Sequence, residues 1–206
     1  MSFSWIYLAS QSPRRQQLLN QLGVPFKLLL PDAQEDIEGL EVERPGEDPV
    51  QYVQRVTRAK LEAAIQRRQT QNLPPAPILA ADTTVALHGK IFGKPANTED
   101  AIQTLLLLSG QTHQVLSAVA LAVSPQEAVH SALQISQVQF GTWPLKEIEQ
   151  YVQSGEPMGK AGSYAIQSQA AQWIRHIEGS YSGIMGLPLF ETAELLQRSG
   201  VIFRTI

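Results

Sequence analysis

The chain has 206 residues, of which 43% are hydrophobic and 17% charged, as is ordinary for a folded globular protein. A formal net charge of -3 gives no basic footprint for polymeric nucleic acid, and the lack of cysteine excludes disulfides, thiolate metal sites and cysteine nucleophiles. No segment approaches the roughly 18 apolar residues of a membrane span, and the N-terminus does not read as a signal peptide. We therefore expect a cytoplasmic protein with no membrane partner.

The first predicted elements are a short apolar strand over 5–9 and a helix over about 13–22, with Ser12 in a position that suits an N-cap. Arg14 and Arg15 in the first turn oppose the helix dipole by roughly 0.3–1 kcal/mol each, so local stability does not explain them. A bound anion would make the two arginines favourable at this position, because the free N–H groups, the helix dipole and the two guanidinium groups would all attract it. The alternative is a pair of solvated surface arginines.

An acidic, turn-rich stretch over 31–47 has no clear period and is expected to be a loop or lid. Asp48 then suits the N-cap of a second helix, whose apolar stripe includes Val53 and Val56. Lys60 falls on the same stripe, four residues after Val56. Its ammonium group either reaches the rim of the apolar surface or points into a cleft.

The stretch 78–95 predicts a strand, a tight turn and a return segment. Small and apolar residues from Ile78 suit a strand covered on both faces, and Asp82 sits where that run stops. A turn at His88-Gly89 would bring Lys94 back beside the acid. A carboxylate at the end of a buried strand next to a lysine suits phosphate chemistry. The alternative is a strand whose exposed end carries charge.

The rest of the chain alternates between helices and strands. Helices are predicted over about 99–109 with Thr98 as the cap, over about 144–154, and from Pro188; strands over 115–123, 129–140, 163–167, 172–178 and 201–204; glycine-rich loops over 155–162 and 179–186. The four leucines over 105–108 are expected in the core. Hairpins together with crossovers predict an α/β protein with a mixed, α+β-like sheet. Because there is neither a repeat nor a clear linker, we expect one domain over 1–206.

Several chemistries are excluded by spacing. The chain has no phosphate-binding P-loop, no dinucleotide-binding glycine motif, no nucleophile elbow, and no histidines at metal-ligand spacing. A bound metal would therefore be a hard cation on carboxylates, such as Mg²⁺ or Mn²⁺. What remains is a set of cations and one acid, which together suit a polyphosphate substrate. The cations are Arg14, Arg15, Lys60 and Lys94, with Lys160 as a further candidate, and the acid is Asp82. The runner-up on these residues is a phosphosugar or phosphomonoester hydrolase.

Four motifs, in order, resemble the Maf nucleotide pyrophosphatases. They are S-x-S-P-R-R over 10–15, A-D-T over 81–83 with G-K-P over 93–95, K-A-G-x-Y-x-I-Q over 160–167, and G-L-P-L over 186–189. The combination is most similar to the dTTP/UTP branch. The resemblance implies an elongated, two-lobed fold with a central cleft, usually a homodimer. It also implies house-cleaning hydrolysis of dTTP, UTP or modified pyrimidine triphosphates to the monophosphate and pyrophosphate, with a divalent cation.

The resemblance also implies roles for residues. Asp82 would activate the attacking water; Ser10, Arg14, Arg15, Lys60 and Lys94 would face the triphosphate; Glu35 and Asp82 would hold the metal; Arg14, Thr83 and Gln167 would set nucleotide choice. The chain departs from the family pattern at Gln34, Gly159, Ser168 and Gly183, where aspartate, aspartate, glycine and asparagine are common. Ser168 and Gly183 are expected near the base, so they bear on the preferred base more than on the reaction.

A second hypothesis is a nucleotide-binding regulator, because the family is linked to arrest of septum formation. Such a protein would need the cations and the base pocket but not Asp82. An intact acid beside intact phosphate ligands favours the enzyme.

Overall fold

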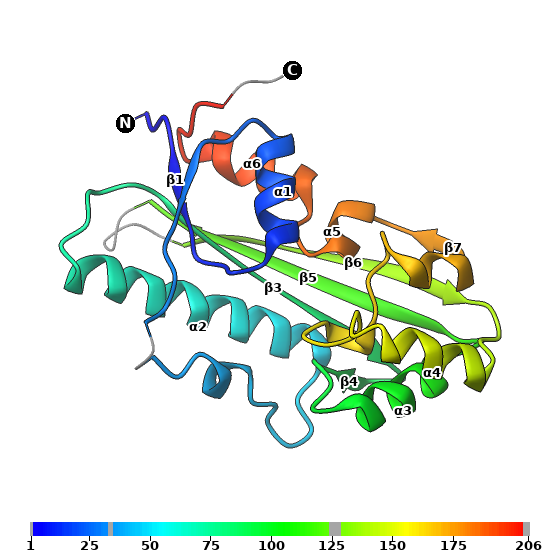
Figure 1. Cartoon of the computed structure of the whole chain (residues 1–206). Coiled ribbons are helices and arrows are strands. Elements are labelled where there is room, and N and C mark those ends of the chain that lie inside the picture. The colour runs from blue at the N-terminus through cyan, green and yellow to red at the C-terminus, as the bar shows by residue number, and fades with distance from the viewer. Residues whose placement is uncertain (1, 33–34, 124–128, 204–206) are drawn as a thin grey trace.

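The computed structural model describes residues 2–32, 35–123 and 129–203 of the chain, and its strands form one seven-stranded sheet (Figure 1). The strands are β1 (Ile6–Leu8), β2 (Phe26–Leu28), β3 (Ile78–Leu87), β4 (Lys90–Phe92), β5 (Thr112–Ala122), β6 (His130–Phe140) and β7 (Ile174–Glu178). Their order is β2-β1-β3-β5-β6-β7, and β4 pairs with β3. β1 runs parallel to β2 and β3, whereas β3, β5, β6 and β7 are antiparallel. The predicted mixed sheet is confirmed.

Six α-helices accompany the sheet in the described part of the chain. They are α1 (Pro13–Gln21), α2 (Pro49–Thr70), α3 (Thr98–Leu108), α4 (Leu145–Gln153), α5 (Tyr181–Met185) and α6 (Leu189–Arg198), with 3₁₀ turns at Glu38–Glu41, Ala161–Ser163 and Gln169–Trp173. Within the described ranges, no helix is long and apolar enough to cross a bilayer.

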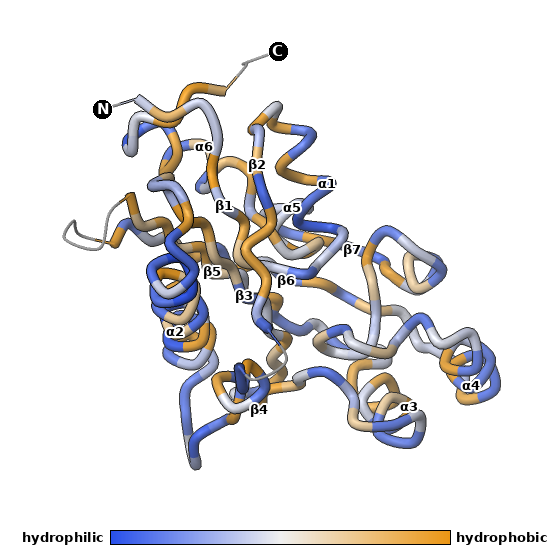
Figure 2. The backbone as a smooth tube through the Cα atoms, turned by 60° about the vertical axis from the view of Figure 1, so that its left-hand side comes forward, coloured by the Kyte–Doolittle hydropathy of each residue, from blue (hydrophilic) through white to orange (hydrophobic). Residues whose placement is uncertain are grey.

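The helices cover both faces of the sheet. Because side chains alternate along a strand, Ala80 and Ala86 of β3 face α2, and Ala81 and Val85 face the larger core. That larger core includes buried side chains from α1, α3, α4, α5 and α6. Figure 2 shows α2 on one side of β3, with α1 and α5 on the other. Neighbouring residues of β3 therefore reach different sets of helices.

The strand β3 is longer than its partners on one edge. β1 pairs with residues 78–79, and β4 pairs with residues 85–87. Among the described strands, residues 80–84 therefore pair with β5 alone. Asp82 and Thr83 lie in this gap and point to opposite faces. The functional residues below are arranged around this interruption in the sheet edge.

The prediction that the buried strand stops at Asp82 is wrong. β3 continues to Leu87 because its pairing with β5 runs past Asp82 without a break. The tight turn is confirmed: His88 and Gly89 have φ angles of 52° and 78°, as a two-residue hairpin of this twist requires.

Two details of α3 differ from the prediction. Asn97, not Thr98, is the N-cap, and its side-chain oxygen accepts a 2.9 Å hydrogen bond from the backbone N–H of Asp100. Leu105 and Leu108 are buried, whereas the two leucines between them are exposed. A helix turns through about 100° per residue, so four consecutive leucines cannot all face one core.

Three elements near the C-terminus also differ. The predicted strand over 163–167 is irregular, because positive φ angles at Gly162 (67°) and Ser163 (61°) turn the chain away from an extended path. The glycine-rich stretch 179–186 contains α5, which the sequence did not predict. Of the predicted strand 201–204, only a single bridge from Val201 to Phe3 forms, and Arg204 lies outside the described residues. Near the N-terminus, the strand β2 is a further element that was not predicted.

The buried side chain of His113 on β5 supports the irregular segment. Its Nε2 lies 2.8 Å from the hydroxyl of Tyr164, and the rings of both residues pack edge-on against Phe140. Burial lowers the pKa of His113 from the ordinary 6.5 to about 4, so the imidazole is neutral near neutral pH.

This depressed pKa predicts a pH-dependent stability. Unfolded His113 would take up a proton as the pH falls below 6.5, and folded His113 only near 4, so stability present above 6.5 is lost between these values. The loss is on the order of 3 kcal/mol at about 1.4 kcal/mol per pKa unit. Urea unfolding of wild type and His113→Gln at several pH values should give a flatter profile for the variant; parallel profiles would contradict it.

Candidate active site

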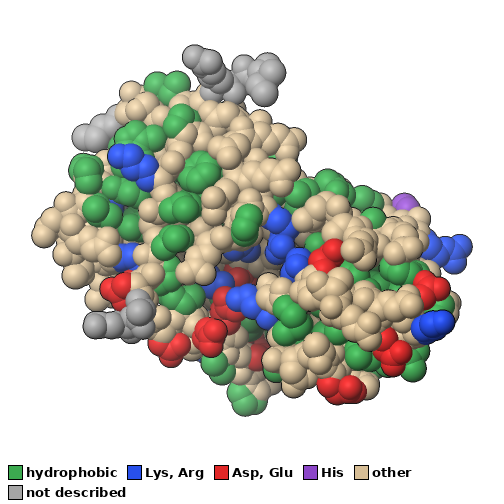
Figure 3. All heavy atoms as spheres, viewed as in Figure 1, with side chains coloured by type: hydrophobic (Ala, Val, Ile, Leu, Met, Phe, Trp, Pro, Cys, Tyr) green, Lys and Arg blue, Asp and Glu red, His purple; other side chains and the backbone are tan. Residues whose placement is uncertain are grey.

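A cavity of about 1090 Å³ opens at the gap in the edge of β3. Residues 9–15 and 184–186 line one side, and residues 93–94, 158–161 and 164–167 line the other. Residues 31–32, 35–38 and 41 contribute further wall. Figure 3 shows Lys and Arg side chains around this hollow, with acidic side chains beside them. The structure therefore has the predicted central cleft between two lobes.

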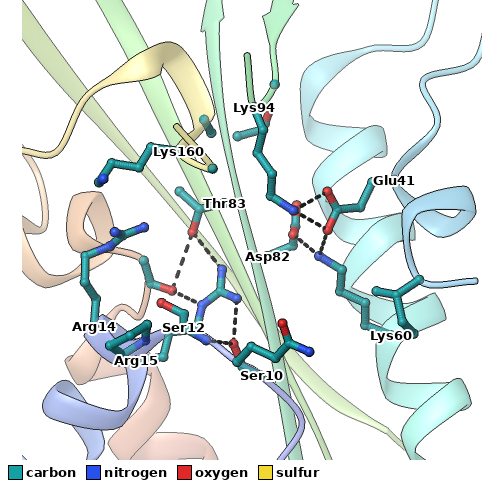
Figure 4. A pocket seen from close by; sticks show the side chains of 18 of the residues that line it. Ser10, Ser12, Arg14, Arg15, Glu41, Lys60, Asp82, Thr83, Lys94 and Lys160 are labelled. Atoms are coloured by element: carbon teal, nitrogen blue, oxygen red, sulfur yellow. Dashed lines mark hydrogen bonds and ion pairs between the residues drawn. The ribbon is translucent and has the colours of Figure 1, made fainter. Parts of the chain in front are cut away.

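Four side chains on the α2 side of the cavity form a row of alternating charge (Figure 4). Lys60 Nζ donates to Asp82 Oδ1 at 2.5 Å and to Glu41 Oε1 at 2.7 Å. Lys94 Nζ donates to Glu41 Oε2 at 2.6 Å. The two carboxylates thus share one ammonium group. Asp82 Oδ2 accepts no hydrogen bond from the described residues, so it is available to a ligand or a water molecule.

The position of Lys60 follows from the period of α2. Val53, Val56 and Leu61 are fully buried, and Lys60 lies on the same stripe with only 13% of its side chain exposed. Its ammonium group therefore points into the cavity. Of the two alternatives for Lys60, the structure shows the one in which it points into a cleft, and not the rim position.

Glu41 was not singled out from the sequence as a member of this row. Three consecutive carbonyl groups around it accept hydrogen bonds from α2: those of Leu40 and Val42 from Arg55, at 3.3 and 3.0 Å, and that of Glu41 from the hydroxyl of Tyr52, at 2.8 Å. Burial would raise the pKa of the Glu41 carboxyl, but Lys60 and Lys94 together outweigh it and lower this pKa. Glu41 is thus held in place and ionised.

Glu35 has a different environment, although it also lines the cavity. Both of its carboxylate oxygens accept hydrogen bonds from Arg67, whose side chain is 3% exposed and also donates to the carbonyl of Leu29. The hydrogen bond from Arg67 lowers the pKa of Glu35. The contacts of Glu35 therefore fasten the acidic loop to α2, and Arg67 joins the same helix to the residue that follows β2.

Arg15 connects α1 to the opposite face of β3. Its guanidinium group donates to the carbonyl of Gly186 at 2.8 Å and to the hydroxyls of Ser10 and Thr83 at 3.2 and 3.3 Å (Figure 4). Thr83 also lies 2.8 Å from the hydroxyl of Ser117 on β5. Burial lowers the pKa of Arg15, and the charge of Asp82 opposes that shift.

Arg14 and Lys160 approach the cavity from its two sides. Arg14 donates to the carbonyl of Met185 at 3.3 Å, and Lys160 donates to the carbonyl of Glu156. Burial lowers the pKa of both groups, and Arg14 lowers that of Lys160 further. Within the described residues, neither they nor Arg15 forms an ion pair. The interpretation of Arg14 and Arg15 as solvated surface groups is wrong, and such a concentration of positive charge suits an anion.

All the site residues predicted from the sequence line the same cavity: Ser10, Arg14, Arg15, Glu35, Lys60, Asp82, Thr83, Lys94 and Gln167. Gln167 is exposed, and its amide makes no hydrogen bond to the described residues. The hairpin does bring Lys94 into the cavity, but its ion pair is with Glu41 rather than with Asp82.

A divalent cation fits this donor set only together with a phosphate ligand. The described residues contain no group of three or more His, Cys, Asp or Glu side chains placed to hold a metal. Asp82 and Glu41 offer two neighbouring carboxylates. Mg²⁺ is commonly bound by one or two carboxylates plus substrate phosphates and waters, so these two residues fit it.

The fold and the site define an α/β protein with a central, cation-lined cavity suited to a polyphosphate. A family model described as "Maf-like protein" matches residues 5–199, so the chain belongs to the Maf-like family. It is 58% identical over 200 residues to the dTTP/UTP pyrophosphatase of Cupriavidus metallidurans, covering 97% of this chain and 99% of the relative. The dTTP/UTP pyrophosphatase of Albidiferax ferrireducens is 56% identical over 196 residues, covering 95% and 97%.

The ion pair between Glu35 and Arg67 predicts a structural cost for removing either partner. Glu35→Gln leaves the buried guanidinium group without its counter-charge, so the free energy of unfolding should fall by about 1–3 kcal/mol. Glu62→Gln is the matched control, because Glu62 and its ion-pair partner Arg58 each have 59% of their side chains exposed. This substitution should change the free energy of unfolding by less than about 0.5 kcal/mol. Equal effects in urea unfolding would contradict this role of Glu35.

Proposed function

We propose that this protein is a nucleoside triphosphate pyrophosphatase that hydrolyses dTTP and UTP, including modified pyrimidine triphosphates, to the monophosphate and pyrophosphate. The observation that carries the proposal is Asp82, whose Oδ2 accepts no hydrogen bond from the described residues. The same cavity is lined by Arg14, Arg15 and Lys160, which form no ion pair within those residues. Relatives named dTTP/UTP pyrophosphatase over nearly the full length of the chain support the substrate class. House-cleaning of the nucleotide pool follows from that activity.

In the proposed mechanism, Asp82 accepts a proton from water. Its Oδ1 is held by Lys60 at 2.5 Å, which leaves Oδ2 to bind the water. As the proton moves to Asp82, the water oxygen forms a bond to the α-phosphorus and the bond from that phosphorus to the bridging oxygen breaks. Pyrophosphate leaves with the bonding electrons. Cations placed around a transferring phosphoryl group stabilise the developing charge.

The cations divide between the two sides of the cavity. Lys60 and Lys94, already paired with carboxylates, would face the triphosphate beside Asp82, while Arg14 and Arg15 with Ser10 would bind it from the side of α1. The second group has no carboxylate partners among the described residues. Its positive charge is therefore not offset by the protein and can neutralise the phosphate groups of the substrate. This asymmetry favours a triphosphate over a monophosphate product.

We propose Mg²⁺ or Mn²⁺ as the metal, held by Asp82 and Glu41 together with phosphate oxygens. Glu35 is the less suitable ligand of the two glutamates, because Arg67 already occupies both of its oxygens. When bound, the cation would supply additional neutralisation of the phosphate charge.

Base selection is assigned to three residues that line the cavity, Arg14, Thr83 and Gln167. The free amide of Gln167 can both donate to and accept from a pyrimidine edge. We also propose one domain over 1–206, a homodimer and a cytoplasmic location. The regulator hypothesis is less favoured, because a protein that only binds nucleotides has no need for an acid such as Asp82 held in the cavity by Lys60.

The first test is the reaction itself. Purified protein with Mg²⁺ or Mn²⁺ should release pyrophosphate from dTTP and UTP in a nucleotide panel, and orthophosphate as first product would overturn the proposal. Asp82→Asn should lower kcat by at least about 10²-fold, because it removes the general base. Circular dichroism and urea unfolding establish that the variant is folded. Near-normal turnover in the folded variant would remove Asp82 from that role.

The second test separates the two glutamates. Glu41→Gln should raise the Mg²⁺ concentration for half-maximal rate and lower kcat/KM by about 10–100-fold, because a carboxylate ligand and a partner of Lys60 and Lys94 are lost. Folded Glu35→Gln should stay within about threefold of wild type in both quantities. The opposite ranking would restore Glu35 as the metal ligand.

A further inference from the structure

The residue proposed to recognise the base, Gln167, lies on a segment without a strand ladder. Residues 163–167 are irregular, so their position is not fixed by pairing with the sheet. A side chain that discriminates between bases must be held in place by its surroundings, since a mobile amide would adapt to the wrong partner. The structure must therefore fix this segment by other contacts.

One anchor precedes Gln167. Tyr164 lies against buried His113, with 2.8 Å between the hydroxyl oxygen and Nε2. Gly162 fixes the approach to this anchor: its φ is 67°, and a Cβ there would lie 2.7 Å from a methyl group of Val85. The beginning of the segment is thereby held close to β3 and β5.

The other anchor directly follows Gln167. The hydroxyl of Ser168 donates to Glu156 Oε1, and the hydroxyl of Tyr151 on α4 donates to the same oxygen at 2.7 Å. The carbonyl of Ala165 lies 2.8 Å from the Ser168 hydroxyl and accepts the Ser168 backbone N–H at 3.3 Å. Glu156 therefore links the residue after Gln167 to α4, which is packed in the main core.

We propose that Ser168 and Glu156 are positioning residues that fix the backbone of Gln167 and so determine which base the cavity accepts. This inference rests on the proposed pyrophosphatase activity and adds the means by which its base preference is set. Neither residue needs to touch the substrate. Ser168 acts through the hydrogen bond of its hydroxyl to Glu156, and Glu156 acts through its second partner, Tyr151. The backbone of Gln167 is then held in one place, which fixes the position from which its amide reaches the base.

The test compares nucleotides rather than total activity. Steady-state kcat and KM are measured for UTP, dTTP and CTP with wild type and Ser168→Ala. CTP carries an amino group where UTP carries a carbonyl oxygen, so a change in the position of the Gln167 amide should alter the preference between the two. For Ser168→Ala we expect the ratio of kcat/KM between UTP and CTP to narrow by about fivefold or more, mainly through KM, with kcat for UTP within about twofold.

Two further variants make the result specific. Ser168→Thr keeps the hydroxyl and should restore the wild-type ratio. Ser109→Ala is the matched control, because it also removes a hydroxyl bonded to backbone groups, those of Trp143, but outside this segment. It should leave the ratio unchanged. Urea unfolding of every variant establishes that the comparison is made on folded protein.

The outcomes separate this inference from the proposed function. If wild type releases pyrophosphate from none of the nucleotides, the proposed function fails. If wild type is active and Ser168→Ala keeps the wild-type ratio, or loses kcat equally on all three nucleotides, the positioning role fails while the function stands. A narrowed ratio in Ser168→Ala that Ser168→Thr does not restore also contradicts the role of the hydroxyl.

Discussion

The arrangement of the site depends on one constraint, the unequal length of β3 and its outer partners. β1 pairs with residues 78–79 and β4 with residues 85–87, so the intervening edge is left open in the described sheet. The opening gives a ligand access to a strand that is otherwise buried. Because side chains alternate, Asp82 then meets α2 and Thr83 meets α1 and α5. Asp82 and Thr83, the residue proposed to help select the base, thus reach one cavity from opposite faces of the sheet.

The electrostatics of the cavity follow from that division. On the α2 side, Asp82 and Glu41 are matched by Lys60 and Lys94, and these two cations lower the pKa of the Glu41 carboxyl. On the α1 side, the cations are held by carbonyl and hydroxyl groups, which orient them without neutralising them. The first arrangement suits a base and a metal ligand, and the second suits an anion. Both kinds of environment are required to bind a triphosphate and activate water beside it.

Sequence reasoning succeeded where a period or a cap constrained the chain. The stripe of α2 located Lys60, and the unfavourable dipole position of two arginines pointed to an anion site. It failed in segments whose conformation is set by distant contacts. Glu41 lies in a loop without a period and is placed by Tyr52 and Arg55, which no local pattern indicates. The metal role that family resemblance implies for Glu35 stays a prediction, and the ion pair of Glu35 with Arg67 was not predicted. The predicted strand over 163–167 does not form, because Gly162 and Ser163 adopt positive φ angles that turn the chain away from an extended path.

The central claim is that Asp82 directs water to the α-phosphorus of a nucleoside triphosphate. The most direct measurement is hydrolysis of dTTP or UTP in heavy-oxygen water, with mass spectrometry of both products. Attack at the α-phosphorus places the heavy oxygen in the nucleoside monophosphate and leaves pyrophosphate unlabelled. Heavy oxygen in the pyrophosphate instead would mean attack at the β-phosphorus and would contradict the role given to Asp82.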